Sequence, residues 1–509
     1  MTIKRVILVT LTVLAVFLMG QDLLNSWNQP QIQSRLELYQ TNLLLRATEL
    51  QENDPNMDAA RKAFLGAEPT KNALEQYQDV QQQVQQTLKQ TQALLSERDS
   101  SNKAQPESLG QTERKLTRLV TELDLKLGIL RSQQGEAALA QTEWSKVIQQ
   151  AEADSGLKPL AATAAVLQGL WAKSPQLLPD AEPQIQKNLD GWFRDRALTQ
   201  LYTLQQRSSD LQALEITEQQ AAEKALTSLA IVGGIPVLSG VIGIGLLIFA
   251  IGQWVLQRKQ AILSTESLQP WTTPWDGETI WQVLILGFFM VGQIALPILL
   301  AVLQRATGLN PAGFGEQGRA LFILFNYVLL AVGGLGVLYW SIKSYLPLPE
   351  DWFRISLKGN WFWWGLGGYF AALPLVVVVS LVNQKIWQGR GGSNPILPIA
   401  LEGKNSFALA IFFVTAAIAA PIFEEILFRG FLLPSLTRYF PVWGAIILSS
   451  FLFAVAHLSL SEVLPLMTLG MVLGFVYSRS RNLLSSMLLH SLWNSGTLLS
   501  LIILGSGQG

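Results

Sequence analysis

Nine apolar segments constrain the fold of this chain more than any other feature of its sequence. Each approaches or reaches the roughly 20 residues with which an α-helix crosses the hydrocarbon core of a bilayer. The whole chain is 49% hydrophobic and only 15% charged, which is too apolar for an ordinary soluble protein of 509 residues. We therefore predict an all-α, polytopic membrane helix bundle of about nine spans. The segments are residues 5–20, 226–256, 278–303, 319–343, 361–384, 406–428, 441–460, 462–478 and 483–504.

The overall charge and the residue types that are missing exclude several functions. The formal net charge is zero, so nothing in the composition indicates a nucleic-acid partner. The chain has no cysteine, which excludes disulfides, thiolate metal sites and cysteine nucleophiles. His457 and His490 are the two histidines of the chain. Any imidazole chemistry must therefore use one or both of them.

A polar stretch rich in Gln, Glu, Leu and Ala, residues 21–225, interrupts the membrane pattern. Apolar side chains recur every three or four residues between positions 74 and 95, which predicts one face of a helix. We therefore predict an inserted soluble domain that is entirely helical. Within it, residues 127–144 resemble one helix pair of a tetratricopeptide repeat, although an ordinary helical hairpin with a glycine turn fits the same pattern. The residues that carry this resemblance are Leu127, Gly128, Gly135, Ala140 and Trp144.

The apolar and polar stretches divide the chain into four predicted parts. The first apolar segment follows two basic residues and resembles the h-region of a signal peptide, but no clear small-residue cleavage site lies near Gly20. We therefore predict an uncleaved anchor. The four parts are an N-terminal membrane anchor (1–20), the soluble helical domain (21–225), a second span with a linker (226–277) and a carboxy-terminal membrane domain (278–509).

Basic residues at the ends of the first two spans predict the orientation in the membrane. Lys4 and Arg5 precede the first span, and Arg258 and Lys259 follow the second. Loops on the cytoplasmic side carry an excess of such residues. The pattern predicts a multi-pass protein of the plasma membrane or another internal membrane, with residues 21–225 outside the cytoplasm.

Three short motifs place ionisable and polar groups inside the last apolar segments. They are Glu424-Glu425-x-x-x-Arg429, Phe453-x-x-x-His457 and His490-x-x-x-Asn494. If the helices turn near residues 437–441 and 478–482, the polar groups of all three motifs lie roughly 12–22 Å from the same side of the bundle. Side chains four residues apart share a helix face, so each motif can direct two groups at one volume.

The two adjacent carboxylates have different predicted environments. Glu425 and Arg429 are four residues apart and can form an internal ion pair, whereas Glu424 lies about 100° further round the helix and remains free. An ionisable group near the bilayer centre costs about 2.5–3.5 kcal/mol, so such groups are candidates for a functional site. A carboxylate in this setting suits a general base.

The ordered set of motifs resembles the CPBP family. This family comprises the CAAX prenyl protease type intramembrane proteases and the bacteriocin self-immunity proteins. The resemblance covers residues 400–500. It implies that residues 278–509 form an intramembrane protease domain. It implies that Glu424 and His457 bind and activate the attacking water, and that His490 and Asn494 stabilise the oxyanion. Glu425 and Arg429 would be structural support.

The sequence leaves the use of a metal open. The resemblance favours a glutamate-type mechanism without a cofactor. Glu424, His457 and His490 could instead bind zinc, because two histidines and one glutamate form a known zinc ligand set. No HExxH motif accompanies them.

Two other functions compete with that of an intramembrane endopeptidase. One is a non-catalytic membrane scaffold or immunity protein. The other is a proton-coupled transporter, since buried acidic and histidine residues also build proton relays. No second half of the chain repeats such positions, which counts against a transporter. The predicted partners are a protein or peptide substrate in the membrane, the lipid bilayer, and a partner protein on residues 21–225.

Overall fold

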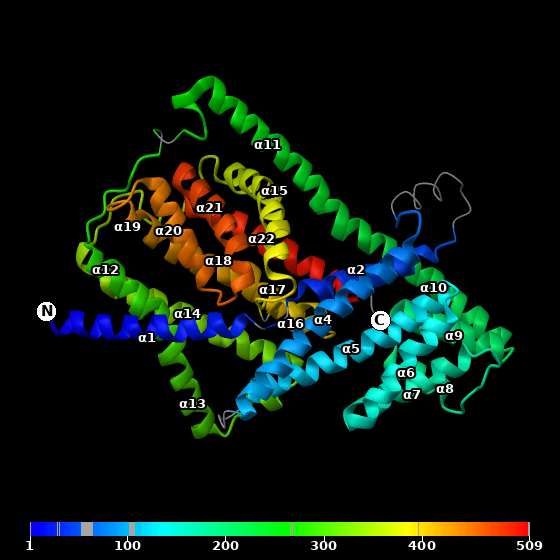
Figure 1. Cartoon of the computed structure of the whole chain (residues 1–509). Helices are drawn as coiled ribbons and strands as arrows, with labels where there is room; N and C mark the ends of the chain where they lie inside the picture. The colour runs from blue at the N-terminus through cyan, green and yellow to red at the C-terminus, as the bar shows by residue number, and fades with distance from the viewer. Residues whose placement is uncertain are drawn as a thin grey trace. The chain divides into compact units, whose positions relative to one another are not determined.

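The computed structural model describes residues 2–506, except 28, 30, 52–64, 101–106, 265, 267 and 395, and its described elements are all helices (Figure 1). The chain separates into two compact units. The membrane unit contains Met1–Trp27, Ile235–Trp387 and Gly391–Ile502, and the helical unit contains Asn28–Gly234, Gln388–Arg390 and Ile503–Gly509.

Eight helices of the described residues are long and apolar enough to cross a membrane, and the shorter apolar helix α20 (Val442–Val455) accompanies them. The predicted all-α membrane bundle is therefore confirmed, as is a multi-pass integral membrane protein. The other helices of the membrane unit are α1 (Ile3–Ser26), α11 (Ile235–Gln257), α12 (Gly277–Gln282), α13 (Leu296–Thr307), α14 (Glu316–Ile342), α15 (Trp361–Trp387), α16 (Ile396–Glu402), α17 (Ser406–Val414), α18 (Ala420–Glu425), α19 (Leu433–Leu436), α21 (Val463–Ser480) and α22 (Leu483–Ser506).

Wider π-helical turns interrupt two long helices that lie wholly within the membrane unit. One such segment, η4 (Val283–Ala295), links α12 to α13. Two more, η7 (Thr415–Ala419) and η8 (Ile426–Leu432), lie on either side of α18 within the helix that runs from α17 to α19. Single turns of this kind inside α-helices frequently mark functional sites. The remaining short 3₁₀ turns are η3 (Arg258–Gln260), η5 (Pro311–Gly313), η6 (Lys343–Tyr345) and η9 (Leu460–Glu462).

Helix α1 contacts the rest of the membrane unit at both of its ends. Lys4 and Arg5 form ion pairs with Glu278 at 3.0 and 2.7 Å. At the other end, the Ser26 hydroxyl accepts a hydrogen bond from the backbone N–H of Leu460 at 3.2 Å. The first apolar segment is thus part of the bundle rather than an isolated tail.

Three arginines hold the connection between α11 and α12 against the ends of later helices. Arg438 donates to the carbonyl oxygens of Thr273 and Trp275, and Arg479 donates to the carbonyl oxygens of Ala261 and Ser264. Arg481 lies over the Trp271 ring, 3.5 Å from its centroid. Basic residues at the ends of the spans therefore bind the backbone of this connection.

The helical unit is a stack of helix pairs around one apolar core. At its centre Trp144 is fully buried, and its indole donates to the carbonyl oxygen of Leu125 at 3.2 Å. Gly128 allows this contact, because a Cβ there would lie 2.2 Å from the indole nitrogen. The helices are α2 (Gln33–Thr48), α4 (Pro69–Ser100), α5 (Glu107–Gln133), α6 (Ala137–Ala153), α7 (Lys158–Leu170), α8 (Ala181–Asn188), α9 (Gly191–Leu204) and α10 (Ser208–Leu229), with a 3₁₀ turn η1 (Ser155–Leu157) and a π-helical segment η2 (Ala230–Gly234).

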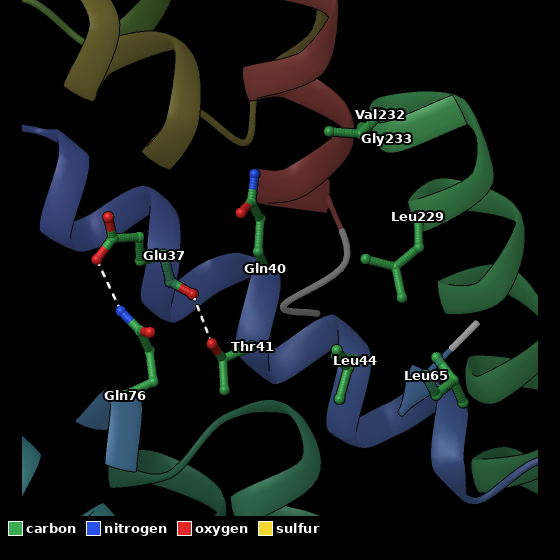
Figure 2. Close-up of a pocket in the computed structure, with 9 residues that line it drawn as sticks. All are labelled: Glu37, Gln40, Thr41, Leu44, Leu65, Gln76, Leu229, Val232 and Gly233. Carbon is green, nitrogen blue, oxygen red and sulfur yellow. Dashed lines mark hydrogen bonds between the residues drawn. The ribbon is translucent and has the colours of Figure 1, made fainter. Parts of the chain in front are cut away.

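A cavity of 330 Å³ lies within the helical unit where α2 and α4 meet the end of α10 (Figure 2). Its polar part is organised by Glu37, whose carboxylate accepts a hydrogen bond from Gln76 at 2.7 Å. The other lining residues are Gln40, Thr41, Leu44, Leu65, Leu229, Val232 and Gly233.

Candidate active site

The two glutamates lie at the end of α18, in the short α-helical stretch between the π-helical segments η7 and η8. Pro421 occupies the first turn of α18 and has no backbone N–H to donate. The Ala420 N–H bonds to the carbonyl oxygen of Thr415, five residues earlier. The next donor in this register would be residue 421, so the proline leaves the carbonyl oxygen of Ala416 without an intrahelical partner.

The side chain of Asn494, on α22, supplies the hydrogen bond that Pro421 cannot. Its amide nitrogen donates to the carbonyl oxygen of Ala416 at 2.7 Å. An amide nitrogen carries two hydrogens, so a second donor remains on Asn494. The predicted oxyanion residue thus has a structural contact that the sequence did not reveal.

Glu425 is the carboxylate that the fold holds in place. Its side chain is 0% exposed, and its Oε1 accepts a hydrogen bond from Arg429 Nη1 at 2.8 Å. Arg429 also donates to the carbonyl oxygen of Gly470 at 3.2 Å and lies over the Phe453 ring. The pair therefore links the helix of the glutamates to α20 and α21.

His490, on α22, lies between the two carboxylates. Its Nδ1 is 2.9 Å from Glu425 Oε1, and its Nε2 is 3.9 Å from Glu424 Oε2. A carboxylate accepts and cannot donate when ionised, so the contact with Glu425 keeps a proton on Nδ1.

Glu424 is in a different environment from its neighbour. Its side chain is 16% exposed, and its Oε1 accepts a hydrogen bond from the hydroxyl of Tyr327 at 3.1 Å. Its Oε2 has no hydrogen-bond donor among the described residues. Tyr327 lies on α14, and sequence reasoning missed it. A tyrosine inside an apolar span was the available signal, because a buried phenol hydroxyl usually has a partner.

His457 does not lie on a membrane helix, contrary to the expectation from its motif. Helix α20 ends at Val455, and His457 follows in a turn in which Leu458 has a φ of +56°. The backbone N–H of His457 donates to the carbonyl oxygen of Ala454. The side-chain Nδ1 of His457 lies 2.9 Å from the carbonyl oxygen of Phe453 and donates to it. The imidazole therefore satisfies a carbonyl at the helix end, where α-helices lack donors. Because a carbonyl only accepts, Nδ1 carries the proton and Nε2 is free to accept.

Phe453 connects the two histidines. Its ring meets the imidazole of His457 edge-on at a centroid distance of 4.9 Å and that of His490 at 5.7 Å. The structure thus brings Glu424, Glu425, Arg429 and His490 into direct contact, and places His457 beside them through this ring. Asn494 follows His490 by one turn of α22.

No group of three or more histidine, aspartate or glutamate side chains that could hold one metal ion occurs among the described residues. The zinc alternative at Glu424, His457 and His490 stays a prediction. The absence of a cofactor also stays a prediction.

The protein is a helical membrane bundle in which carboxylates and an imidazole lie in contact. It therefore belongs to the class of polytopic membrane proteins with a candidate hydrolytic centre. Residues 406–496 match the family described as type II CAAX prenyl endopeptidase Rce1-like. The chain is also 25% identical over 170 residues to the protein named "Putative membrane peptidase YdiL" of Bacillus subtilis (strain 168), a match that covers 31% of this chain and 68% of the relative. No solved structure matches.

The family match falls on the part of the chain that carries the three motifs. The two similarities confirm the resemblance to the CPBP family of membrane proteases that was seen in the sequence. The helical unit lies outside the residues matched by the family.

Proposed function

We propose that this protein is an intramembrane endopeptidase that hydrolyses a peptide bond of a membrane-associated protein with water activated by Glu424 and His457. The observation that carries the proposal is the unequal treatment of two adjacent carboxylates. Glu425 is 0% exposed, and its Oε1 is bound by both Arg429 and His490. Glu424 is 16% exposed, and the hydrogen-bond donor to its Oε1 is the neutral hydroxyl of Tyr327. A structural ion pair needs only the first of these carboxylates.

The free groups of the site suit acyl transfer to water. Glu424 Oε2 would take a proton from the water, whose position is fixed by the free Nε2 of His457. The water oxygen forms a bond to the carbonyl carbon, and the carbonyl oxygen becomes an oxyanion. The carbon–nitrogen bond then breaks, and the proton on Glu424 passes to the leaving amine.

In this proposal His490 and Asn494 stabilise the oxyanion. Asn494 has one amide hydrogen left beyond its bond to Ala416. With Nδ1 bonded to Glu425, His490 would donate to the oxyanion through a protonated Nε2. Donors of this kind are typically worth about 100- to 1,000-fold in turnover.

Comparison of cells that carry the wild-type chain with cells that carry Glu424→Gln tests this function. Mass spectrometry of membrane-protein termini should find new termini that depend on Glu424, and these would identify the substrate. Glu350→Gln is the matched control, because Glu350 is exposed and lies in a loop of the same unit. Equal termini in the wild type and Glu424→Gln, at equal expression, would favour a non-catalytic scaffold.

Three further parts of the proposal concern the surroundings of the site. No cofactor is required, so a chelator should leave the cleavage rate unchanged; loss of activity that zinc restores would support the zinc alternative. Residues 21–225 lie outside the cytoplasm and bind the substrate or a partner protein. Glu425 and Arg429 support the site without taking part in proton transfer.

A further inference from the structure

We propose that Tyr327 is a positioning residue that fixes the orientation of the Glu424 carboxylate, so that its second oxygen serves as the base. This inference rests on the proposed function and assigns a role to a helix outside the family match. Tyr327 lies on α14, which ends before the matched residues 406–496 begin. Its hydroxyl donates to Glu424 Oε1 at 3.1 Å.

The rest of the bundle fixes the position of Tyr327 relative to Glu424. Its ring meets Phe423 edge-on at a centroid distance of 6.1 Å, and Phe423 is 2% exposed. Seven residues further along α14, Gly334 faces the same Phe423 ring, because a Cβ there would lie 3.1 Å from it. Positions seven apart share a helix face. Two contacts on one face of α14 therefore hold the tyrosine against α18.

The choice of a neutral donor matters for the chemistry. Arg429 neutralises Glu425 with a full positive charge at 2.8 Å. A tyrosine hydroxyl binds one oxygen of Glu424 and adds no charge, so the carboxylate remains available as a base. With Oε1 occupied, rotation of the carboxylate would break the hydrogen bond. Oε2 is thereby kept on the side of His490, whose Nε2 lies 3.9 Å away.

Tyr327 affects the cleavage rate through its hydrogen bond to Glu424. Deletion of its hydroxyl by Tyr327→Phe should lower kcat about 10- to 100-fold, the range expected for a hydrogen bond to a charged group. KM should change less than about twofold, because the tyrosine touches the base and not the substrate.

The matched control is the same deletion at another buried tyrosine. Tyr477 is 0% exposed, and its hydroxyl has no hydrogen-bond partner among the described residues. Tyr477→Phe should therefore leave kcat unchanged. It also measures what the loss of a buried phenol oxygen does to the amount and thermal stability of the folded protein.

The test uses the full-length chain in proteoliposomes and an internally quenched peptide that spans the cut site with the strongest dependence on Glu424. Four proteins are compared: wild type, Tyr327→Phe, Glu424→Gln and the double variant. We expect the double variant to have the same residual rate as Glu424→Gln alone, because no catalytic carboxylate remains at position 424 for Tyr327 to orient. A further loss in the double variant would overturn the inference.

The outcomes separate this inference from the proposed function. Wild-type cleavage by Glu424→Gln would refute the proposed function itself. An inactive Glu424→Gln together with a fully active Tyr327→Phe would leave that function standing and refute the role of Tyr327. Tyr327→Phe could act by lowering stability alone. In that case it would lower the cleavage rate per folded molecule in the Glu424→Gln background as well as in the wild type, and the four-protein comparison detects this.

Discussion

Arg429 and Glu425 form an ion pair in which both side chains are at most 1% exposed. Removal of one member would leave the other charge buried without a partner, which costs about 3–5 kcal/mol in folded proteins. We therefore expect Arg429→Met to lower the free energy of unfolding of the detergent-solubilised protein by an amount in this range, and to lower its melting temperature. Intrinsic tryptophan fluorescence during heating would measure it.

A double variant provides the control for this prediction. In Glu425→Gln/Arg429→Met neither charge remains, and the new amide oxygen can still accept from His490. Stability should recover most of the loss seen in Arg429→Met, because replacement of a complete buried pair is often neutral. A single variant as stable as the wild type would contradict the assignment of Arg429 to structural support.

Asn494 combines two tasks that a pair of substitutions can separate. Asn494→Ala should lower turnover more than binding, and should also cost about 1–3 kcal/mol of stability because the Ala416 carbonyl loses its donor. Pro421→Ala restores a backbone N–H at the position that could bond to Ala416. The double variant Pro421→Ala/Asn494→Ala should regain stability but not turnover, measured by thermal unfolding and by cleavage rate. Recovery of both would mean that Asn494 serves the helix alone.

At the scale of the element, the approach of α14 to its neighbours depends on a glycine. A Cβ at Gly334 would lie 3.0 Å from the carbonyl oxygen of Gly287 and 3.1 Å from the Phe423 ring. Gly334→Ala should push α14 away from α18 and stretch the contact between Tyr327 and Glu424. Misplacement of a catalytic group by about 1 Å can cost 100-fold, so we expect a marked fall in kcat.

Gly336 offers a matched control on the same helix. A Cβ at this position meets nothing within 4 Å. Gly336→Ala should therefore leave the cleavage rate unchanged and raise helix propensity slightly. Equal rates for Gly334→Ala and wild type would show that the site tolerates movement of α14.

The elements differ in how far the sequence could predict them. The long spans were predictable, because apolar length is a property of the sequence alone. The end of α20 at Val455 was not, since residues 456–460 contain no proline or glycine that would mark a helix end. The turn is recognised by its hydrogen bonds. The π-helical segments were also invisible, because a register change of one residue leaves the apolar pattern nearly intact.

The same limit applies to the candidate site. Three motifs pointed to six residues, because buried charge is rare enough in a membrane span to be noticed. Tyr327 carries no charge and comes from a distant segment, so its contact with Glu424 follows from the packing of α14 on α18 and from no spacing in the sequence. The bond between Asn494 and Ala416 depends on the register of one π-helical turn, which no spacing in the sequence predicts.

At the scale of the whole molecule, the absence of cysteine makes the predicted orientation easy to test. Gln134 and Arg258 are both exposed and lie on opposite sides of α11 in the sequence. We expect Gln134→Cys to react with a membrane-impermeant maleimide in intact cells, and Arg258→Cys to react only after permeabilisation. The reverse pattern would place residues 21–225 in the cytoplasm.

The contacts of α1 impose an order on the synthesis of the protein. The helix leaves the ribosome first, but its partner Glu278 comes 273 residues after Arg5, and Leu460 comes 434 residues after Ser26. At about 5–20 residues per second, the second contact becomes possible roughly 20–90 s after the first helix is made. During that interval α1 remains without its contact to the backbone of Leu460. The bundle can therefore close only when its last spans arrive, at the moment when the candidate site is itself completed by His490.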